Sequence, residues 1–212
     1  TSTYDLGASV TVDSSDNIYV TGYTTGGFDN NTNLGGGDIF LVKYNSSGTK
    51  QWTEQFVSQY NDYSYGVAVD SSDNIYVTGF TAGGLDGNTN AGGGDYDTFL
   101  VKYNSSGAKQ WTKQFGTSSD DSGYGVTVDS SDNIYVTGWT NGGLDGNTSA
   151  GSNDLFLIKY NSSGTKQWTR QLGTSSDEYG YEVAVDNSSN IYVTGKTDGG
   201  LDGNSNAGSS DI

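Results

Sequence analysis

The sequence predicts an all-β fold, a β-propeller built from four-stranded antiparallel blades with about three and a half blades present. One observation is a repeat of nearly constant length, because the motif Val-x-Val-Asp recurs in four copies at steps of 57, 59 and 57 residues, ending at Asp13, Asp70, Asp129 and Asp186. A second is that β-branched and aromatic residues gather in short runs between Gly, Asn, Asp and Ser. A third is that no apolar stripe has helical spacing.

Each copy is expected to supply four strands, which the second copy illustrates. They are Val67–Val69, Ile75 to about Thr81, Phe99–Tyr103 and Lys109–Phe115. The middle strands are apolar or aromatic on both faces, which indicates sheets stacked between neighbouring sheets. The opening residues, 1–9, are interpreted as the tail of a connector.

The repeats divide the chain into one array of blades. We expect blade 1 at residues 1–65 with its N-terminal connector, blade 2 at 66–123, blade 3 at 124–181 and half of blade 4 at 182–212. That half contains only the first two strands, because the Phe that opens the third strand would fall at position 213. Its second strand is expected to present an open edge. More of the same array or a neighbouring chain in an oligomer or filament would cover this edge, and a short self-sufficient open array would leave it uncovered.

Composition excludes several classes of function. With 25 acidic and 9 basic residues and a net charge of −16, the chain lacks the clustered positive charge that nucleic-acid binding needs. It has no Cys and no His, hence no thiol nucleophile, no imidazole base and no nitrogen or sulfur ligand for zinc. No apolar run approaches the length of a membrane span, so membrane insertion is not expected. Because no carboxylate pair differs from its copies in the other repeats, we predict no catalytic residues and no enzymatic activity.

The loop between the second and third strands repeats oxygen-bearing side chains at alternate positions. This arrangement suits a hard cation such as Ca²⁺, although the bidentate Glu of an EF-hand is absent. The same residue types also form turns without metal. Both interpretations stay open for the four sets, which are Asp29, Asn31, Asn33, Asp38; Asp86, Asn88, Asn90, Asp95; Asp145, Asn147, Ser149, Asp154; and Asp202, Asn204, Asn206, Asp211.

Aromatic residues are expected at the same end of the blades as these loops. Trp139 ends a second strand where the other copies have Tyr23, Phe80 and Lys196. Together with Tyr63, Tyr96, Tyr124 and Tyr179, it is a candidate platform for a carbohydrate or protein ligand. The alternative is that the tyrosines are wedges between adjacent blades.

The repeated sequence, VAVDSSDNIYVTG followed by DTFLVKYNSSGAKQWTKQFG, resembles the bacterial SBBP β-propeller repeat family and, more distantly, quinoprotein-type propellers. The resemblance covers essentially the whole chain. It implies a propeller in a secreted or surface-exposed bacterial protein, and it implies no reaction. The expected function is a non-catalytic extracellular or cell-surface scaffold or recognition surface. The alternatives are a self-assembling protomer and a non-catalytic domain of a larger polysaccharide-acting enzyme.

Overall fold

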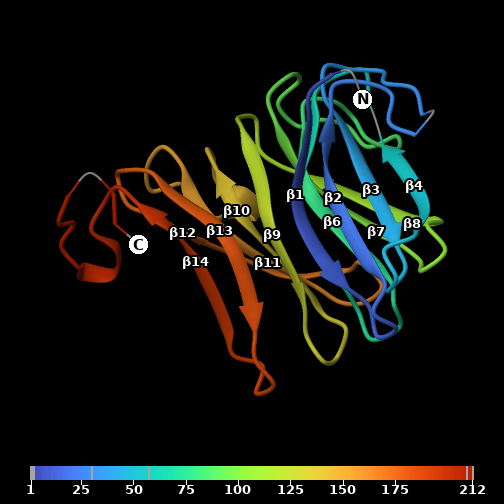
Figure 1. The fold of residues 1–212 in the computed structure, drawn as a ribbon. Helices are drawn as coiled ribbons and strands as arrows, with labels where there is room; N and C mark the ends of the chain where they lie inside the picture. The colour runs from blue at the N-terminus through green and yellow to red at the C-terminus, as the bar shows by residue number, and fades with distance from the viewer. Residues whose placement is uncertain (1–2, 30, 57, 209, 212) are drawn as a thin grey trace.

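A computed structural model describes residues 3–29, 31–56, 58–208 and 210–211, and its architecture is all-β. Three four-stranded antiparallel sheets are followed by a two-stranded sheet, and each sheet follows chain order (Figure 1). This confirms the predicted propeller blades. The first sheet consists of β1 (Asp5–Val12), β2 (Ile18–Thr24), β3 (Asp38–Tyr44) and β4 (Lys50–Phe56), and the second of β5 (Asp62–Val69), β6 (Ile75–Thr81), β7 (Asp97–Tyr103) and β8 (Lys109–Phe115).

The third and fourth sheets repeat this order. The third consists of β9 (Asp121–Val128), β10 (Ile134–Thr140), β11 (Asp154–Tyr160) and β12 (Lys166–Leu172), and the fourth of β13 (Glu178–Val185) and β14 (Ile191–Thr197). Two short 3₁₀ turns, Leu144–Gly146 and Leu201–Gly203, lie in the loops after β10 and β14. Asp211 forms an isolated bridge with Thr197.

The first strand of each sheet is longer than the sequence predicts. β5 begins at Asp62 rather than Val67, and β1 begins at Asp5, inside the predicted connector. The reason is a β-bulge, which leaves Tyr65 of β5 without a partner on β6 and lets pairing continue on both sides of it. The second and third blades therefore start at Asp62 and Asp121, a few residues before the predicted boundaries at 66 and 124.

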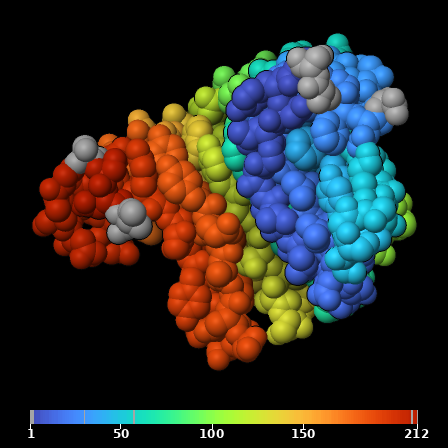
Figure 2. Space-filling model, in the orientation of Figure 1, coloured from blue at the N-terminus to red at the C-terminus, as the bar shows by residue number. Residues whose placement is uncertain are grey.

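The sheets stack face to face, with their first strands on the inside. β5 packs against both β1 and β9, and β9 also packs against β13. One buried core, which includes Tyr19 and Phe99, joins the first two sheets, and a second core joins the second and third. The first and fourth sheets lie at opposite ends of this stack (Figure 2).

The inner strands of neighbouring sheets approach each other closely at a glycine in β5 and a glycine in β9. A Cβ atom on Gly66 would lie 2.5 Å from the carbonyl oxygen of Tyr124, and one on Gly125 would lie 2.9 Å from Cα of Glu182. The same register position holds Ser9 in β1 and Glu182 in β13. The fourth sheet thus carries a long charged side chain where the two middle sheets carry glycine.

A glycine in each second strand makes room for a phenylalanine of the third strand. Gly22, Gly79 and Gly138 pair with Phe40, Phe99 and Phe156. A Cβ on Gly138 would collide with the carbonyl oxygen of Ser122 and lie 2.9 Å from the Phe156 ring. Both neighbours are buried, so neither can move aside easily.

We therefore expect Gly138→Ala to destabilise the protein by about 2–3 kcal/mol, as overpacking of a well-packed core does. Urea denaturation should show the loss as a lower midpoint. Gly208→Ala is the matched control, because a Cβ there meets no atom within 4 Å. Equal midpoints for the two variants would contradict the packing described here.

Candidate functional site

In three of the four sheets, the bulge places a tyrosine at the loop end of the inner strand. Tyr65, Tyr124 and Tyr181 are the residues that the bulged register leaves unpaired in β5, β9 and β13, and Ala8 holds the equivalent position in β1. A bulge redirects the side chain of its extra residue. Here it brings the rings of successive blades together, with centroids 4.9 Å apart between Tyr65 and Tyr124 and 5.8 Å apart between Tyr124 and Tyr181.

These rings belong to a continuous array that crosses all four sheets. Tyr23 of the first sheet meets Tyr63 of the second edge-on at 4.5 Å, and Trp139 of the third meets Tyr179 of the fourth at 5.7 Å. We name the connected set the aromatic row. It comprises Tyr4, Tyr23, Tyr63, Tyr65, Phe80, Tyr96, Tyr124, Trp139, Tyr179 and Tyr181.

All five residues of the predicted platform lie in this row. Tyr63, Tyr124 and Tyr179 lie in the first strands of their sheets, because these strands begin earlier than the sequence predicts. Most rings of the row are half-buried, whereas Tyr4 is 58 % exposed and Tyr181 46 % exposed. The rings therefore pack between blades and also present edges to solvent, so the two interpretations of these tyrosines are compatible.

Polar atoms of the row are suited to hydrogen bonding. Burial raises the pKa of Tyr65 to about 12, with the neighbouring tyrosines adding to the effect, so its hydroxyl remains a donor at neutral pH. The indole Nε1 of Trp139 is buried and, among the described residues, has no hydrogen-bond partner. Buried indole nitrogens usually have one.

In three of the predicted calcium loops, the first acidic residue contacts side chains of the fourth strand. Asp86 has a left-handed backbone (φ 52°), and its carboxylate contacts the Lys109 ammonium and the Thr112 hydroxyl of β8. The first and third blades repeat this arrangement with Asp29, Lys50, Thr53 and with Asp145, Lys166, Thr169. A lysine thus lies where the cation would bind.

The other predicted ligands are engaged in turns. Asn31, Asn88, Asn147 and Asn204 donate their side-chain amides to carbonyl oxygens three residues earlier. The Asn90 amide donates to the carbonyl oxygen of Asp95, and its Oδ1 accepts from Gly92 and Gly94. The Ser149 hydroxyl donates to the carbonyl oxygen of Gly151, and Asn206 Oδ1 accepts from the Gly208 amide. Two further predicted ligands are Asn33, whose buried Nδ2 has no partner among the described residues, and Asp202, which has a left-handed backbone (φ 51°).

For the second copy, the sequence-based prediction names the wrong residue, Asp95, as the last acidic position of the pattern. Asp38 and Asp154 pair with Thr24 and Thr140 at the start of the third strand, and the residue that pairs with Thr81 in this way is Asp97, not Asp95. The second copy has two extra residues before this strand, and the sequence carries the signal that places them, because Asp38, Asp97 and Asp154 each precede the phenylalanine of the third strand by two residues. Asp38, Asp97, Asp154 and Asp211 each accept a loop backbone amide. Across the described ranges, no three acidic residues gather as a metal cluster would require.

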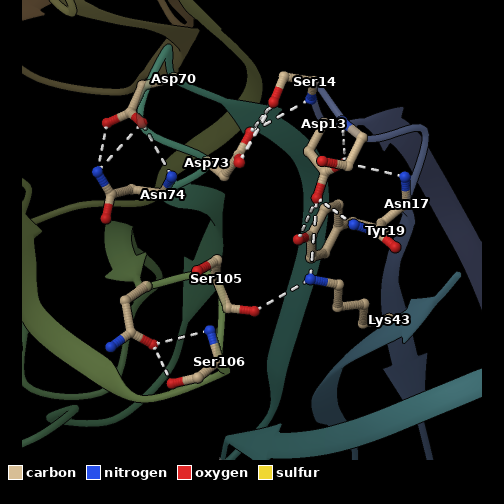
Figure 3. A network of polar contacts seen from close by, with 12 residues as sticks. Asp13, Ser14, Asn17, Tyr19, Lys43, Asp70, Asp73, Asn74, Ser105 and Ser106 are labelled. Carbon is tan, nitrogen blue, oxygen red and sulfur yellow. Dashed lines mark hydrogen bonds and ion pairs between the residues drawn. The ribbon is translucent and has the colours of Figure 1, made fainter.

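The opposite, turn end of the blades holds a second polar arrangement (Figure 3). Asp13 accepts hydrogen bonds from Asn17 and from the Tyr19 hydroxyl, and Lys43 lies 3.8 Å away. In the second blade burial acts to raise the pKa of Asp70, but hydrogen bonds from Asn74 and Tyr76 outweigh it and hold the pKa below its usual value.

A further contact at this end joins neighbouring blades. The backbone amide and hydroxyl of Ser14 donate to Asp73, and Ser71 donates to Asp132 in the same way. From the sequence alone, Asp73 and Asp132 lie in short hairpin loops and are expected to be turn residues. Their role between blades depends on pairing across the repeat, which only the structure displays.

Buried carboxyl groups meet where one blade joins the next. Asp38 lies near Asp62, and Asp97 near Asp121, and all four are at most 1 % exposed. Burial raises the pKa of Asp62 and Asp121 to about 6, and the neighbouring carboxyl contributes to the rise. In each pair the residue from the third strand, Asp38 or Asp97, retains an oxygen without a hydrogen-bond partner in the described chain.

These raised pKa values predict how stability changes with pH. Because the folded state holds protons on Asp62 and Asp121 more tightly than the unfolded chain, their contribution to stability is full below about pH 4 and is lost as pH rises through 6. Deprotonation of each group lowers the free energy of unfolding by about 2–3 kcal/mol between pH 4 and pH 7. Urea denaturation at pH 4.5, 5.5 and 7 should show this fall, and the double variant Asp62→Asn, Asp121→Asn should show a shallower one. Stability that rises with pH across this window would refute the assignment.

Comparisons with known proteins agree with this architecture. The sequence profile of the SBBP β-propeller repeat matches residues 1–29, 51–86, 110–145 and 167–202. An uncharacterised WD repeat-containing protein of Acanthamoeba polyphaga mimivirus, L264, is 29% identical over 85% of this chain and 17% of its own length. The regulatory protein FlaEY of Caulobacter vibrioides is 24% identical over 61% of this chain and 15% of its own length.

The chain thus spans about a sixth of the length of these curated relatives. A search of the described residues finds no helix with the length and apolar character needed to cross a membrane.

Proposed function

The chain belongs to the SBBP family of β-propeller repeats, and we propose that it is a non-catalytic recognition module whose ligand binds along the aromatic row. The observation that carries this proposal is the continuity of that row across four blades. It lies at the end of the blades where the loops vary in length, and loops on a rigid scaffold commonly carry binding residues. One relative supports a repeat protein, since it is named for WD repeats.

The chemistry of the row favours a neutral ligand with alternating apolar faces and hydroxyl groups. Tyrosine and tryptophan combine a flat apolar ring with a polar tip, which suits carbohydrate rings and the centres of protein interfaces. The net charge of −16 disfavours polyanionic ligands. We propose an oligosaccharide as the ligand and an extracellular or cell-surface location, where such chains are abundant. A protein partner is the second candidate.

The test measures binding to an array of neutral β-glucans, mannans and galactans, with Tyr124→Ala and Trp139→Ala as variants. Loss of one stacking ring should weaken binding about tenfold, equivalent to about 1.4 kcal/mol. Tyr192→Ala is the matched control, because Tyr192 is 55 % exposed and lies outside the row. No binding to any glycan, or equal binding by all variants, would refute the proposal for carbohydrate.

Calcium is proposed as a stabilising ion of the loops, in competition with lysine. A Ca²⁺ ion at Asp86 has to displace the Lys109 ammonium, so removing that ammonium should favour the ion. We expect Lys109→Met to gain more in melting temperature from CaCl₂ over EGTA than the unchanged chain does. Thermal unfolding midpoints that are the same in CaCl₂ and EGTA for both proteins would contradict the calcium proposal.

The chain covers a small share of its relatives' length, which supports a further proposal, that it acts within a longer polypeptide. A module of this kind can be a non-catalytic part of a longer polypeptide, including a polysaccharide-acting enzyme. Glycan binding by the isolated chain without hydrolysis of the bound glycan fits this role. Release of reducing sugars by the chain itself would contradict it.

A further inference from the structure

We propose that a pocket between the first and second blades binds one neutral sugar ring, with the side chain of Tyr60 stacked against a face of that ring. The pocket lies at the loop end of the blades and is lined by residues outside the aromatic row. This proposal therefore does not depend on ligand binding along that row. The sheets on either side of the pocket each have all four of their strands.

The pocket is small, open and uncharged. Its volume is about 270 Å³, and Tyr60, Gly84, Thr89, Gly93 and Gly94 contribute to its walls. Among the described residues that line it, none carries a charge. Pockets for drug-sized ligands measure about 300–1,000 Å³, so this one suits a neutral ligand of a single ring.

The ring of Tyr60 is exposed but firmly supported. Its residue is 57 % exposed, and a Cβ on Gly83 would lie 2.6 Å from Cδ2 of the ring, so the ring rests on the backbone of the second blade. On the first blade, a Cβ on Gly35 would lie 2.0 Å from the carbonyl oxygen of Tyr60. A ring held in this way loses little conformational freedom when a ligand binds.

Tyr60 departs from the repeat. Ser119 and Ser176 hold its place in the next two connectors, because each of the three backbone amides donates to the hydroxyl of the residue two positions earlier. The counterpart of Gly83 in the third blade is Gly142, and there the nearest atoms to an added Cβ belong to a threonine. The supported aromatic ring is thus particular to the junction of the first and second blades.

The loop between β6 and β7 also departs from the repeat. It is two residues longer than the matching loops of the first and third blades. Gly93 and Gly94 have φ values of 70° and 148°, which favour glycine, and the amides of Gly92 and Gly94 donate to Asn90 Oδ1. The longer loop therefore has a defined path. Both departures from the repeat meet in one pocket, which indicates a role that the other junctions do not share.

The chemistry of the walls identifies the class of ligand. Tyr60 offers a flat apolar ring, and the exposed residues Tyr60 and Thr89 carry hydroxyl groups. A pyranose has an apolar face of C–H groups and a rim of hydroxyls, so it matches both kinds of surface. The net charge of −16 disfavours an acidic sugar.

The experiment uses saturation-transfer NMR on the 212-residue chain, with D-glucose, D-galactose, D-mannose and N-acetyl-D-glucosamine as separate probes. We expect at least one of these sugars to receive saturation from the chain. Tyr60→Ser, which introduces the residue of the other two connectors, should weaken binding of that sugar about tenfold. Tyr192→Ser is the matched control, because Tyr192 is 55 % exposed and lies outside the pocket, and it should bind as the unchanged chain does.

Two further variants separate this pocket from the aromatic row. Deletion of Gly93 and Gly94 gives the loop the length that it has in the first and third blades, and it should also weaken binding about tenfold, because one wall is lost. Tyr124→Ala should leave binding of the single sugar unchanged, so a failed glycan test on the row and a failed test here are distinguishable. No saturation transfer to any of the four sugars, equal binding by Tyr60→Ser, or loss of binding in Tyr124→Ala alone would overturn the proposal.

Discussion

The structure depends on one constraint, which is that its sheets are apolar on both faces. Burying both faces of such a sheet requires a neighbour on each side, which the second and third sheets have. Tyr19, Tyr76 and Tyr135 hold the same place on one face and are at most 2 % exposed, whereas Tyr192 in the fourth sheet is 55 % exposed. On the other face Val67, Val126 and Val183 are at most 7 % exposed, and Val10 in the first sheet is 64 % exposed. Burial therefore follows position in the stack, because the residues are the same.

Polar groups at the two ends of the blades fix how neighbouring sheets align. At the turn end, Ser14 and Asp73 join the first two blades, and Ser71 and Asp132 join the next two. At the loop end, the bulge tyrosines form ring contacts across the same junctions. Apolar stacking alone has little directional preference, so these contacts supply the register between blades that the cores leave undetermined.

Much of this fold can be predicted from the sequence because duplication repeats each signal. The second and fourth strands, such as β6 and β8, have the predicted bounds, since turn residues delimit them on both sides. The first strands could not be predicted in full, because Tyr63 and Tyr65 lie among polar residues and a bulge has no distinct pattern of its own. The Asp86–Lys109 pair joins residues far apart in the sequence, so the sequence displays the acidic loop without its counter-ion. For the same reason the row of tyrosines could be named as separate candidates but not as a connected surface.

Glu182 makes the inner strand of the fourth sheet different from the inner strands of the two middle sheets. The two middle sheets bring bare backbone at Gly66 and Gly125 against the inner strand of the sheet that follows, whereas β13 presents a carboxylate on a flexible stem at that position. An inner strand that approached β13 as closely would have to desolvate this charge. The two ends of the stack are consequently unlike, because the inner strand of the fourth sheet presents a charged side chain where the middle sheets present glycine.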